Sequence, residues 1–134
     1  MPKGESTQAL TIVLYDVPPP EIRGNSRAHF RTVRSINRQR REIAKLLTLD
    51  RMQETGIKSL KPRVLVSYHF YNTREIDLDN LIIGMKPTLD GIVDSGLIED
   101  DKPSSVKLAA EFSLCKKGEK KTIIKIKELN NDVR

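Results

Sequence analysis

The chain has 134 residues and a mass of 15.2 kDa, a size typical of one domain, which we place over residues 1–134. Hydrophobic residues make up 37% and aromatic residues 4%, so we expect a modest core. Apolar runs far shorter than about 20 residues argue against a membrane-spanning helix. Cys115 is the only cysteine, which excludes an intrachain disulfide and a cysteine-based zinc site and favours a cytoplasmic location.

Charge is distributed unevenly along the sequence. The formal net charge is +6, yet residues 21–45 alone carry +6, residues 71–101 carry −6 and residues 102–134 carry +5. An acidic block between two basic segments favours a site that holds a cation against a bound polyanion.

The first expected elements are a strand and a long helix. Residues 1–8 are polar, and we expect them to be disordered. Residues 10–15 are rich in β-branched and aromatic side chains and predict a strand, which ends at three consecutive prolines. No Gly or Pro interrupts residues 27–53, which predict a helix with Asn25 or Ser26 as its N-cap.

The second half of the chain predicts three strands and one interrupted helix. Residues 63–71 alternate between apolar and polar, which is typical of a strand. Residues 79–96 predict a helix whose apolar face contains Leu81, Met85, Leu89 and Ile92. Pro87 is expected to kink this helix or to divide it into two pieces. Two further strands, over 106–114 and 122–127, are expected to pair as a hairpin. We therefore predict an α+β fold of order β-α-β-α-β-β, a small mixed sheet with two helices packed on it.

Basic residues recur along the first predicted helix at intervals of three and four. This spacing places them on one stripe, where they repel one another because Glu42 is the one acidic residue nearby. Arginine pairs with phosphate through a planar fork, so we interpret the stripe as a DNA-binding surface that contacts the backbone. A solvated helix face is the alternative interpretation. The residues concerned are Arg27, Arg31, Arg34, Arg38, Arg41 and Lys45.

Acidic residues gather in the second predicted helix and beside it. We expect Asp77 and Asp79 on the same side of an extended segment, and Asp79, Lys86 and Asp90 on one helix face at about 100° per residue. Carboxylates without a nearby His or Cys form an oxygen-ligand set that suits Mg²⁺ or Mn²⁺. Beside a phosphodiester such a metal activates water, while Lys86 would stabilise developing negative charge.

A structural interpretation of the same residues stays open. In it, Asp79 is a helix N-cap, Asp90 pairs with Lys86 at i, i+4, and residues 99–101 form a solvated loop. Aromatic rings also offer surface for base stacking, although packing is the better interpretation for Phe70 and Phe112, which are aligned with aliphatic neighbours. The other candidates are Tyr15, Phe30, Tyr68 and Tyr71.

The strings that carry the acidic residues resemble the RusA family of Holliday junction resolvases, found in bacteria and their phages. The resemblance covers roughly residues 10–114. Its strings are Asp77-Leu78-Asp79-Asn80-Leu81, Lys86-Pro87-Thr88-Leu89-Asp90-Gly91, Gly96-Leu97-Ile98-Glu99-Asp100-Asp101, and Pro18-Pro19 followed by Asn25-Ser26-Arg27-Ala28-His29-Phe30.

This resemblance implies a homodimeric, Mg²⁺-dependent endonuclease, with Mn²⁺ as a substitute, that cuts four-way DNA junctions at symmetric positions in recombination and repair. It implies a nucleoid-associated protein of bacterial or phage origin, with branched DNA as its partner and no small-molecule cofactor. The residues that match the family's metal-binding aspartates are Asp77, Asp79 and Asp101, its catalytic lysine is matched by Lys86, and further acidic positions are matched by Asp90 and Asp100.

Two other functions stay open at this stage. One is a branched-DNA-binding module of the same lineage without catalysis, and the other is an interaction protein whose basic helix docks on an acidic partner. Both DNA-binding functions predict salt-sensitive binding, but only the nuclease predicts a product that requires Mg²⁺. The interaction protein predicts no preference for branched over linear DNA.

Overall fold

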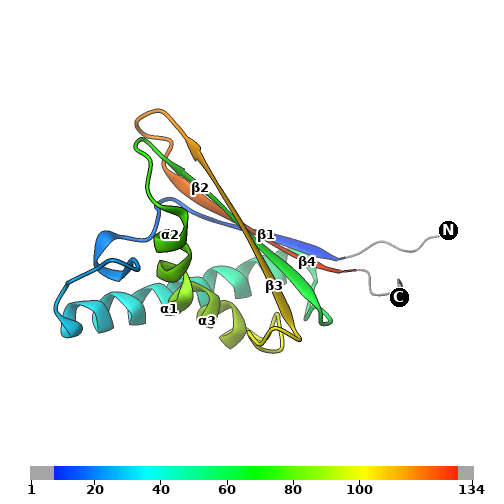
Figure 1. Cartoon of the computed structure of the whole chain (residues 1–134). Helices are drawn as coiled ribbons and strands as arrows, with labels where there is room; N and C mark the ends of the chain where they lie inside the picture. The colour runs from blue at the N-terminus through cyan, green and yellow to red at the C-terminus, as the bar shows by residue number, and fades with distance from the viewer. Residues whose placement is uncertain (1–7, 130–134) are drawn as a thin grey trace.

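The computed structural model describes residues 8–129, which form one four-stranded sheet with the helices packed below it in the view of Figure 1. The predicted α+β class and element order are confirmed. No helix in this range combines the length and the apolar character that crossing a membrane requires. The elements are β1 (Ala9–Leu14), a 3₁₀ turn η2 (Pro20–Ile22), α1 (Phe30–Thr55), β2 (Val64–Asn72), α2 (Leu78–Gly84), α3 (Lys86–Asp94), β3 (Val106–Leu114) and β4 (Lys121–Glu128).

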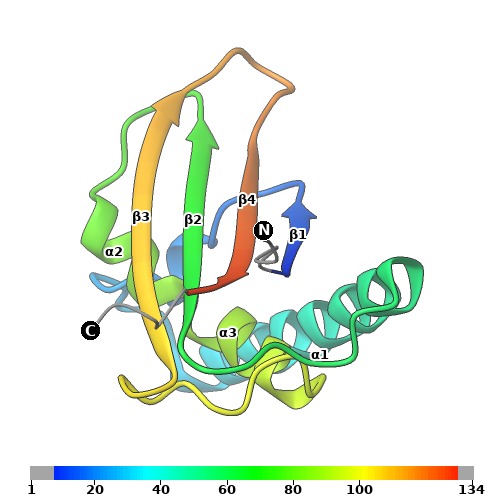
Figure 2. The same ribbon diagram turned by 90° about the vertical axis from the view of Figure 1, so that its right-hand side faces the viewer.

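The sheet is mixed and its strand order is β1-β4-β2-β3 (Figure 2). Strand β2 runs parallel to β3, and β4 lies antiparallel to both β1 and β2. The predicted β3–β4 hairpin is therefore wrong, because β2 lies between these strands. Thr122, Ile124 and Ile126 of the central strand β4 are fully buried, whereas Leu108 and Leu114 of the edge strand β3 are exposed.

The core lies between the sheet and the helices. Alternate residues of β2 point into it, from Val64 to Phe70, and each is at most 2% exposed. The predicted apolar face of the second helical segment is also confirmed, although this segment is two helices with Met85 between them. Pro87 lies in the first turn of α3, where proline needs no backbone donor, as the two-piece alternative predicted. The residues of this two-helix segment that form its apolar face, and lie in the core, are Leu81, Met85, Leu89 and Ile92.

Helix α1 begins later than the sequence predicted. The Ser26 hydroxyl accepts a hydrogen bond from the Ala28 amide, which closes a local turn, and His29 Nδ1 accepts from the Arg31 amide and caps the helix. The N-cap is therefore His29 rather than Asn25 or Ser26, and Arg27 lies outside the helix. At the other end, Gly56 adopts a φ of 76° and stops α1.

Close packing joins α1 to α3 at one glycine. A Cβ added at Gly91 would lie 2.2 Å from the Arg41 carbonyl oxygen and 2.8 Å from the Ala44 Cβ. The absence of a side chain there allows the two helices to approach closely, which brings their polar faces together. Of the segment 1–8, expected to be disordered, residues 1–7 lie outside the described residues, while the Gln8 carbonyl accepts a hydrogen bond from the Glu128 amide at 3.1 Å.

Candidate active site and nucleic-acid interface

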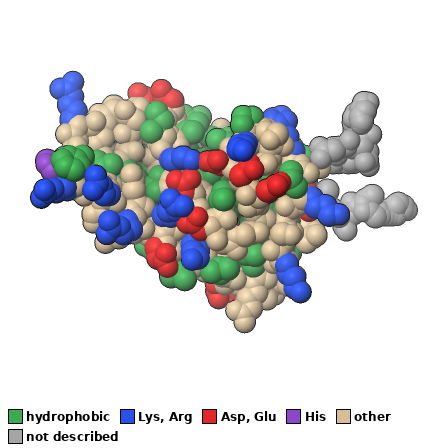
Figure 3. Space-filling model, turned by 90° about the horizontal axis from the view of Figure 1, so that it is seen from below, with side chains coloured by type: hydrophobic (Ala, Val, Ile, Leu, Met, Phe, Trp, Pro, Cys, Tyr) green, Lys and Arg blue, Asp and Glu red, His purple; other side chains and the backbone are tan. Residues whose placement is uncertain are grey.

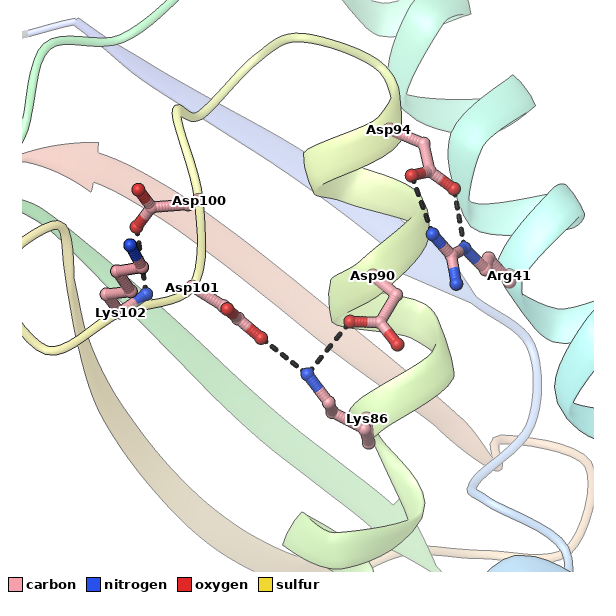
Figure 4. A network of polar contacts seen from close by, with 7 residues as sticks. All are labelled: Arg41, Lys86, Asp90, Asp94, Asp100, Asp101 and Lys102. Carbon is pink, nitrogen blue, oxygen red and sulfur yellow. Dashed lines mark hydrogen bonds and ion pairs between the residues drawn. The ribbon is translucent and has the colours of Figure 1, made fainter.

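Lys86, the first residue of α3, is the centre of a charged network (Figure 4). Its Nζ donates to Asp90 Oδ1 at 2.9 Å and to Asp101 Oδ2 at 2.5 Å. The hydrogen bond to Asp101, and then that to Asp90, raises the pKa of Lys86, and the same bond lowers the pKa of Asp101. The i, i+4 pair of the structural interpretation is therefore present, and a carboxylate 15 residues away joins it.

The loop that carries Asp101 is anchored to the core. Gly96 adopts a φ of 88°, and this left-handed conformation ends the helical segment and reverses the chain. The sequence predicted that the helix ends at this residue. The next two residues, Leu97 and Ile98, are 0% and 3% exposed, and the Leu97 carbonyl accepts a hydrogen bond from the Leu60 amide at 2.7 Å. Asp101 therefore reaches Lys86 from a fixed segment.

One member of the predicted basic stripe is already paired with an acid. Arg41 donates from Nε and Nη2 to the two carboxylate oxygens of Asp94, at 2.6 and 2.9 Å. This bidentate contact raises the pKa of Arg41 and lowers the pKa of Asp94. Arg41 consequently ties α1 to the end of α3 and offers less to a phosphate than its neighbours do.

A groove of about 580 Å³ runs between α1 and the α2–α3 segment. Arg34, Asn37 and Arg38 line one wall, and Lys86 and Asp90 line the other. Among residues 8–129, neither Arg34 nor Arg38 has a carboxylate within ion-pair distance. The face seen from below in Figure 3 shows basic side chains at one end and interleaved acidic and basic ones near its middle.

The basic stripe is shorter than predicted. Arg31, Arg34 and Arg38 lie exposed on α1, Arg41 is paired, Lys45 is half-buried and Arg27 precedes the helix. Asn37 also lines the groove and was not predicted as a site residue; its Oδ1 is buried without a hydrogen-bond partner in the described part of the chain. Asparagine is a poor helix former, and its place between Arg34 and Arg38 was the available signal.

Asp77 and Asp79 lie apart from the Lys86 network. Asp77 is the N-cap of α2, and Asp79 lies in its first turn, where its carboxylate accepts from the Asn80 amide at 2.9 Å. The extended segment expected for this pair ends at Asp77, because Asp79 already belongs to helix α2. Asp79 is not an N-cap either, and it does not line the groove that Lys86 and Asp90 line.

The start of α2 borders a second, polar hollow of about 690 Å³. Asp77 lines it together with Arg23, Arg74 and Lys120. Asp100 also points away from Lys86, because its Oδ1 accepts from the Lys102 amide at 2.9 Å (Figure 4). Within residues 8–129, no three His, Cys, Asp or Glu side chains are placed to hold one metal ion together.

An aromatic ring stands at the start of the basic stripe. Phe30 is 57% exposed, and its ring stacks on His29 with centroids 4.7 Å apart. The guanidinium carbons of Arg31 and Arg34 lie 6.0 and 5.4 Å from its centroid. The arrangement places a flat apolar surface among cations, as proteins that stack nucleic-acid bases do.

Comparison with known proteins gives no family. No protein-family model matches the chain, and no curated protein matches it significantly.

Proposed function

We propose that the protein is a metal-dependent endodeoxyribonuclease that cuts four-way DNA junctions. The observation that carries the proposal is the groove whose two walls have different chemistry. One wall carries Arg34 and Arg38 of α1, which have no acidic partner within residues 8–129, and the other carries the Lys86–Asp90 pair of α3. A phosphodiester held by the arginines lies next to the charged network, where hydrolysis takes place. The resemblance of the acidic strings to RusA resolvases supplies the choice of a branched substrate.

In this proposal each wall has one task. Arg34 and Arg38 bind phosphate oxygens of the cut strand through their guanidinium forks. Lys86 holds its ammonium toward the scissile phosphate and stabilises the negative charge that develops there. Asp90 and Asp101 fix the position of that ammonium, since each accepts one of its hydrogen bonds.

The donor chemistry suits the proposed metal, Mg²⁺ or Mn²⁺. Mg²⁺ binds oxygen ligands, takes one or two protein carboxylates and keeps several waters, so a pair such as Asp90 and Asp101 is sufficient. Each of these carboxylates gives one oxygen to the ammonium of Lys86, so the metal would be held by the second oxygen of each. The resemblance would add Asp77, Asp79 and Asp100 to this set, although within residues 8–129 they do not gather with Asp90 and Asp101 around one point. When bound, the metal would activate water and neutralise charge on the phosphate.

A homodimer is part of the proposal because of the reaction. The described residues of one chain hold one Lys86 network, whereas resolving a junction requires two cuts related by symmetry. A twofold axis between two copies provides the second site.

A cleavage assay tests the proposal. A labelled four-way junction and a linear duplex of the same sequence are incubated with wild type, Asp101→Asn and Asp79→Asn, with Mg²⁺ or with EDTA. Asp50→Asn is the matched control, because Asp50 is an exposed residue of α1 that does not line the groove. We expect paired nicks with Mg²⁺ only, loss of cutting in both site variants by at least about 100-fold, and normal cutting by the control.

Two outcomes would contradict the proposal. Tight binding of the junction without any product in Mg²⁺ or Mn²⁺ would indicate the DNA-binding module instead, a function favoured by the separation of Asp77 and Asp79 from Lys86. Equal binding of junction and duplex, without cutting, would indicate that the basic helix serves another acidic partner.

A further inference from the structure

The face of the sheet turned away from the helices carries its own pattern of side chains. Because the residues of β2 from Val64 to Phe70 that alternate into the core face the helices, the residues between them face the opposite side. Directly paired residues of neighbouring strands share a face, so the register defines this open surface, which is turned to the viewer in Figure 2. Its side chains include Leu65, Ser67, His69 and Tyr71 of β2, Lys107, Glu111 and Ser113 of β3, and Lys121, Ile123, Lys125 and Lys127 of β4.

Two rings form a stack on this face. The His69 and Tyr71 rings are 4.2 Å apart between centroids and inclined by 15°. His69 Nε2 lies 2.7 Å from Ser113 Oγ, and its Nδ1 lies 3.3 Å from the Tyr71 hydroxyl. These contacts come from two strands and hold both rings in fixed orientation, so the stack is built into the sheet.

The side of Tyr71 turned away from His69 faces the ammonium of Lys121. Lys121 Nζ lies 5.1 Å from the ring centroid, and a parallel stack of 4.2 Å leaves no room for it between the rings. A hollow of about 400 Å³ lies beside this ring, lined also by Leu114, Cys115, Lys116, Lys121 and one acidic residue, Glu119. A planar group can therefore enter the hollow and stack on Tyr71 when the ammonium of Lys121 swings aside.

Positive charge extends from the ring stack along the open surface. Lys121, Lys125 and Lys127 lie along β4, and Lys107 lies on β3 beside Leu65. Glu111 is the one carboxylate on the face defined by the paired residues of β2, β3 and β4, and it lies 3.4 Å from His69 Nδ1. Lysines at alternate positions of a strand form a row that matches the repeated negative charge of a phosphate chain.

We propose that the open face of the sheet binds single-stranded nucleic acid, with one base stacked on Tyr71 and the backbone following the lysine row of β4. The Tyr71 ring and its hollow select an unpaired base, because a base within a duplex presents no free face. The carboxylates of an acidic protein would pair with the lysines, but they would not stack on the Tyr71 ring. The proposed junction cleavage uses the opposite side of the molecule, so neither proposal depends on the other.

Binding of a labelled 12-nucleotide oligothymidylate, measured by fluorescence anisotropy, tests this surface. We expect Tyr71→Leu to weaken binding by at least about 5-fold, since stacking on an aromatic side chain contributes that much per base. Tyr71→Phe keeps the ring and should bind within about 2-fold of wild type. Tyr15→Leu is the matched control, because Tyr15 is 82% exposed beyond the end of β1 and outside the surface.

A lysine variant tests the backbone contact without disturbing the partly buried ring. Lys125 is exposed, so Lys125→Gln should fold normally and should reduce the slope of log affinity against log salt by about 0.7. Lys58→Gln, in the loop between α1 and β2, should leave the slope unchanged. An unchanged slope in Lys125→Gln would remove β4 from the binding surface and overturn the proposal.

Cross-linking locates the base. An oligonucleotide that contains 5-iodouracil is irradiated on the full chain, and the cross-linked tryptic peptide is identified by mass spectrometry. The proposal expects residues 64–74, which contain Tyr71. Cross-links confined to residues 28–31, which contain Phe30, would overturn it and assign single strands to α1. Binding of polyglutamate as tight as that of the oligonucleotide, and equally tight in Tyr71→Leu, would overturn it in favour of an acidic protein.

Discussion

Lys86 Nζ lies 2.5 Å from Asp101 Oδ2, so the first residue of α3 is joined to the loop that follows the end of the same helix. The Lys86 side chain is 60% exposed and that of Asp101 36%. Ion pairs this exposed contribute about 1 kcal/mol or less to stability. The contact therefore matters for the position of an ammonium and a carboxylate at the groove, and little for the fold.

The first prediction concerns the titration of Asp101. Lys86→Gln removes the charged donor that lowers the pKa of this carboxyl, so its pKa should rise toward the ordinary value of 3.8. NMR titration of the carboxyl carbons of wild type and variant measures this, with Lys58→Gln as control. The lowered pKa contributes stability that is present above pH 3.8 and is lost as the pH falls through the lower folded value. An identical Asp101 titration in Lys86→Gln would contradict the assignment of the contact.

Local periodicity was sufficient to predict most of the fold. The alternation from Val64 to Phe70 identified β2 and its buried face, and the spacing of Leu81, Met85, Leu89 and Ile92 identified the apolar side of the second helical segment. These patterns arise from burial within one element. Such patterns can therefore be detected in the sequence without knowing which elements pack against each other.

Pairing between elements was less accessible. The prediction that residues 106–114 and 122–127 form a hairpin was wrong, because the alternating pattern of β4 contains no information about which strand pairs with it. The Asp101 contact with Lys86 depends on how Gly96 turns the chain, and that of Arg41 with Asp94 depends on the space left by Gly91. Helical spacing placed Arg41 on the basic stripe. It could not show that the carboxylate of Asp94, on another helix, pairs with Arg41.

The second prediction separates the two kinds of arginine on α1. Arg38→Gln should weaken binding to a labelled four-way junction and reduce the salt slope by about 0.9, the value for one lost phosphate contact on duplex DNA. Arg41→Gln should change the slope less, because its guanidinium is already bonded to Asp94. Anisotropy in EDTA over a range of salt concentrations makes the measurement. Equal slope changes in both variants would mean that Asp94 gives up Arg41 to DNA.

The third prediction concerns the contact between α1 and α3. Gly91→Ala should destabilise the protein by about 1–3 kcal/mol, because the new methyl would meet the Arg41 carbonyl oxygen at 2.2 Å and must push the helices apart. Urea unfolding measures the free energy of unfolding. Gly96→Asn is the control, since no atom lies within 4 Å of a Cβ there and asparagine tolerates its positive φ. A neutral Gly91→Ala would show that the helices separate at little cost.

The fourth prediction concerns a partly buried ion pair. Arg40, whose side chain is 11% exposed, donates two hydrogen bonds to Asp16 at 2.8 and 3.1 Å. Asp16→Ala leaves this guanidinium without its acceptor and should cost about 1–2 kcal/mol, reduced from a fully buried pair because Asp16 is half exposed. Arg40→Met removes the charge with little loss of packing and should cost less. Thermal unfolding of both variants shows which of them loses more stability. A larger loss of stability in Arg40→Met than in Asp16→Ala would contradict this prediction.

The last prediction concerns Phe30 and rests on the proposed function. A ring that is 57% exposed, and flanked by Arg31 and Arg34, can stack on a base pair whose outer face is free at a branch point, but not on a base pair stacked on both sides inside a duplex. Phe30→Ala should therefore weaken binding of the four-way junction by about 5-fold or more and leave binding of linear duplex within about 2-fold. Anisotropy in EDTA measures both substrates, and Tyr15→Ala is the control for loss of an exposed ring elsewhere. Parallel weakening on junction and duplex would assign Phe30 to the packing of the α1 N-terminus, because a stacking role affects only the branched substrate.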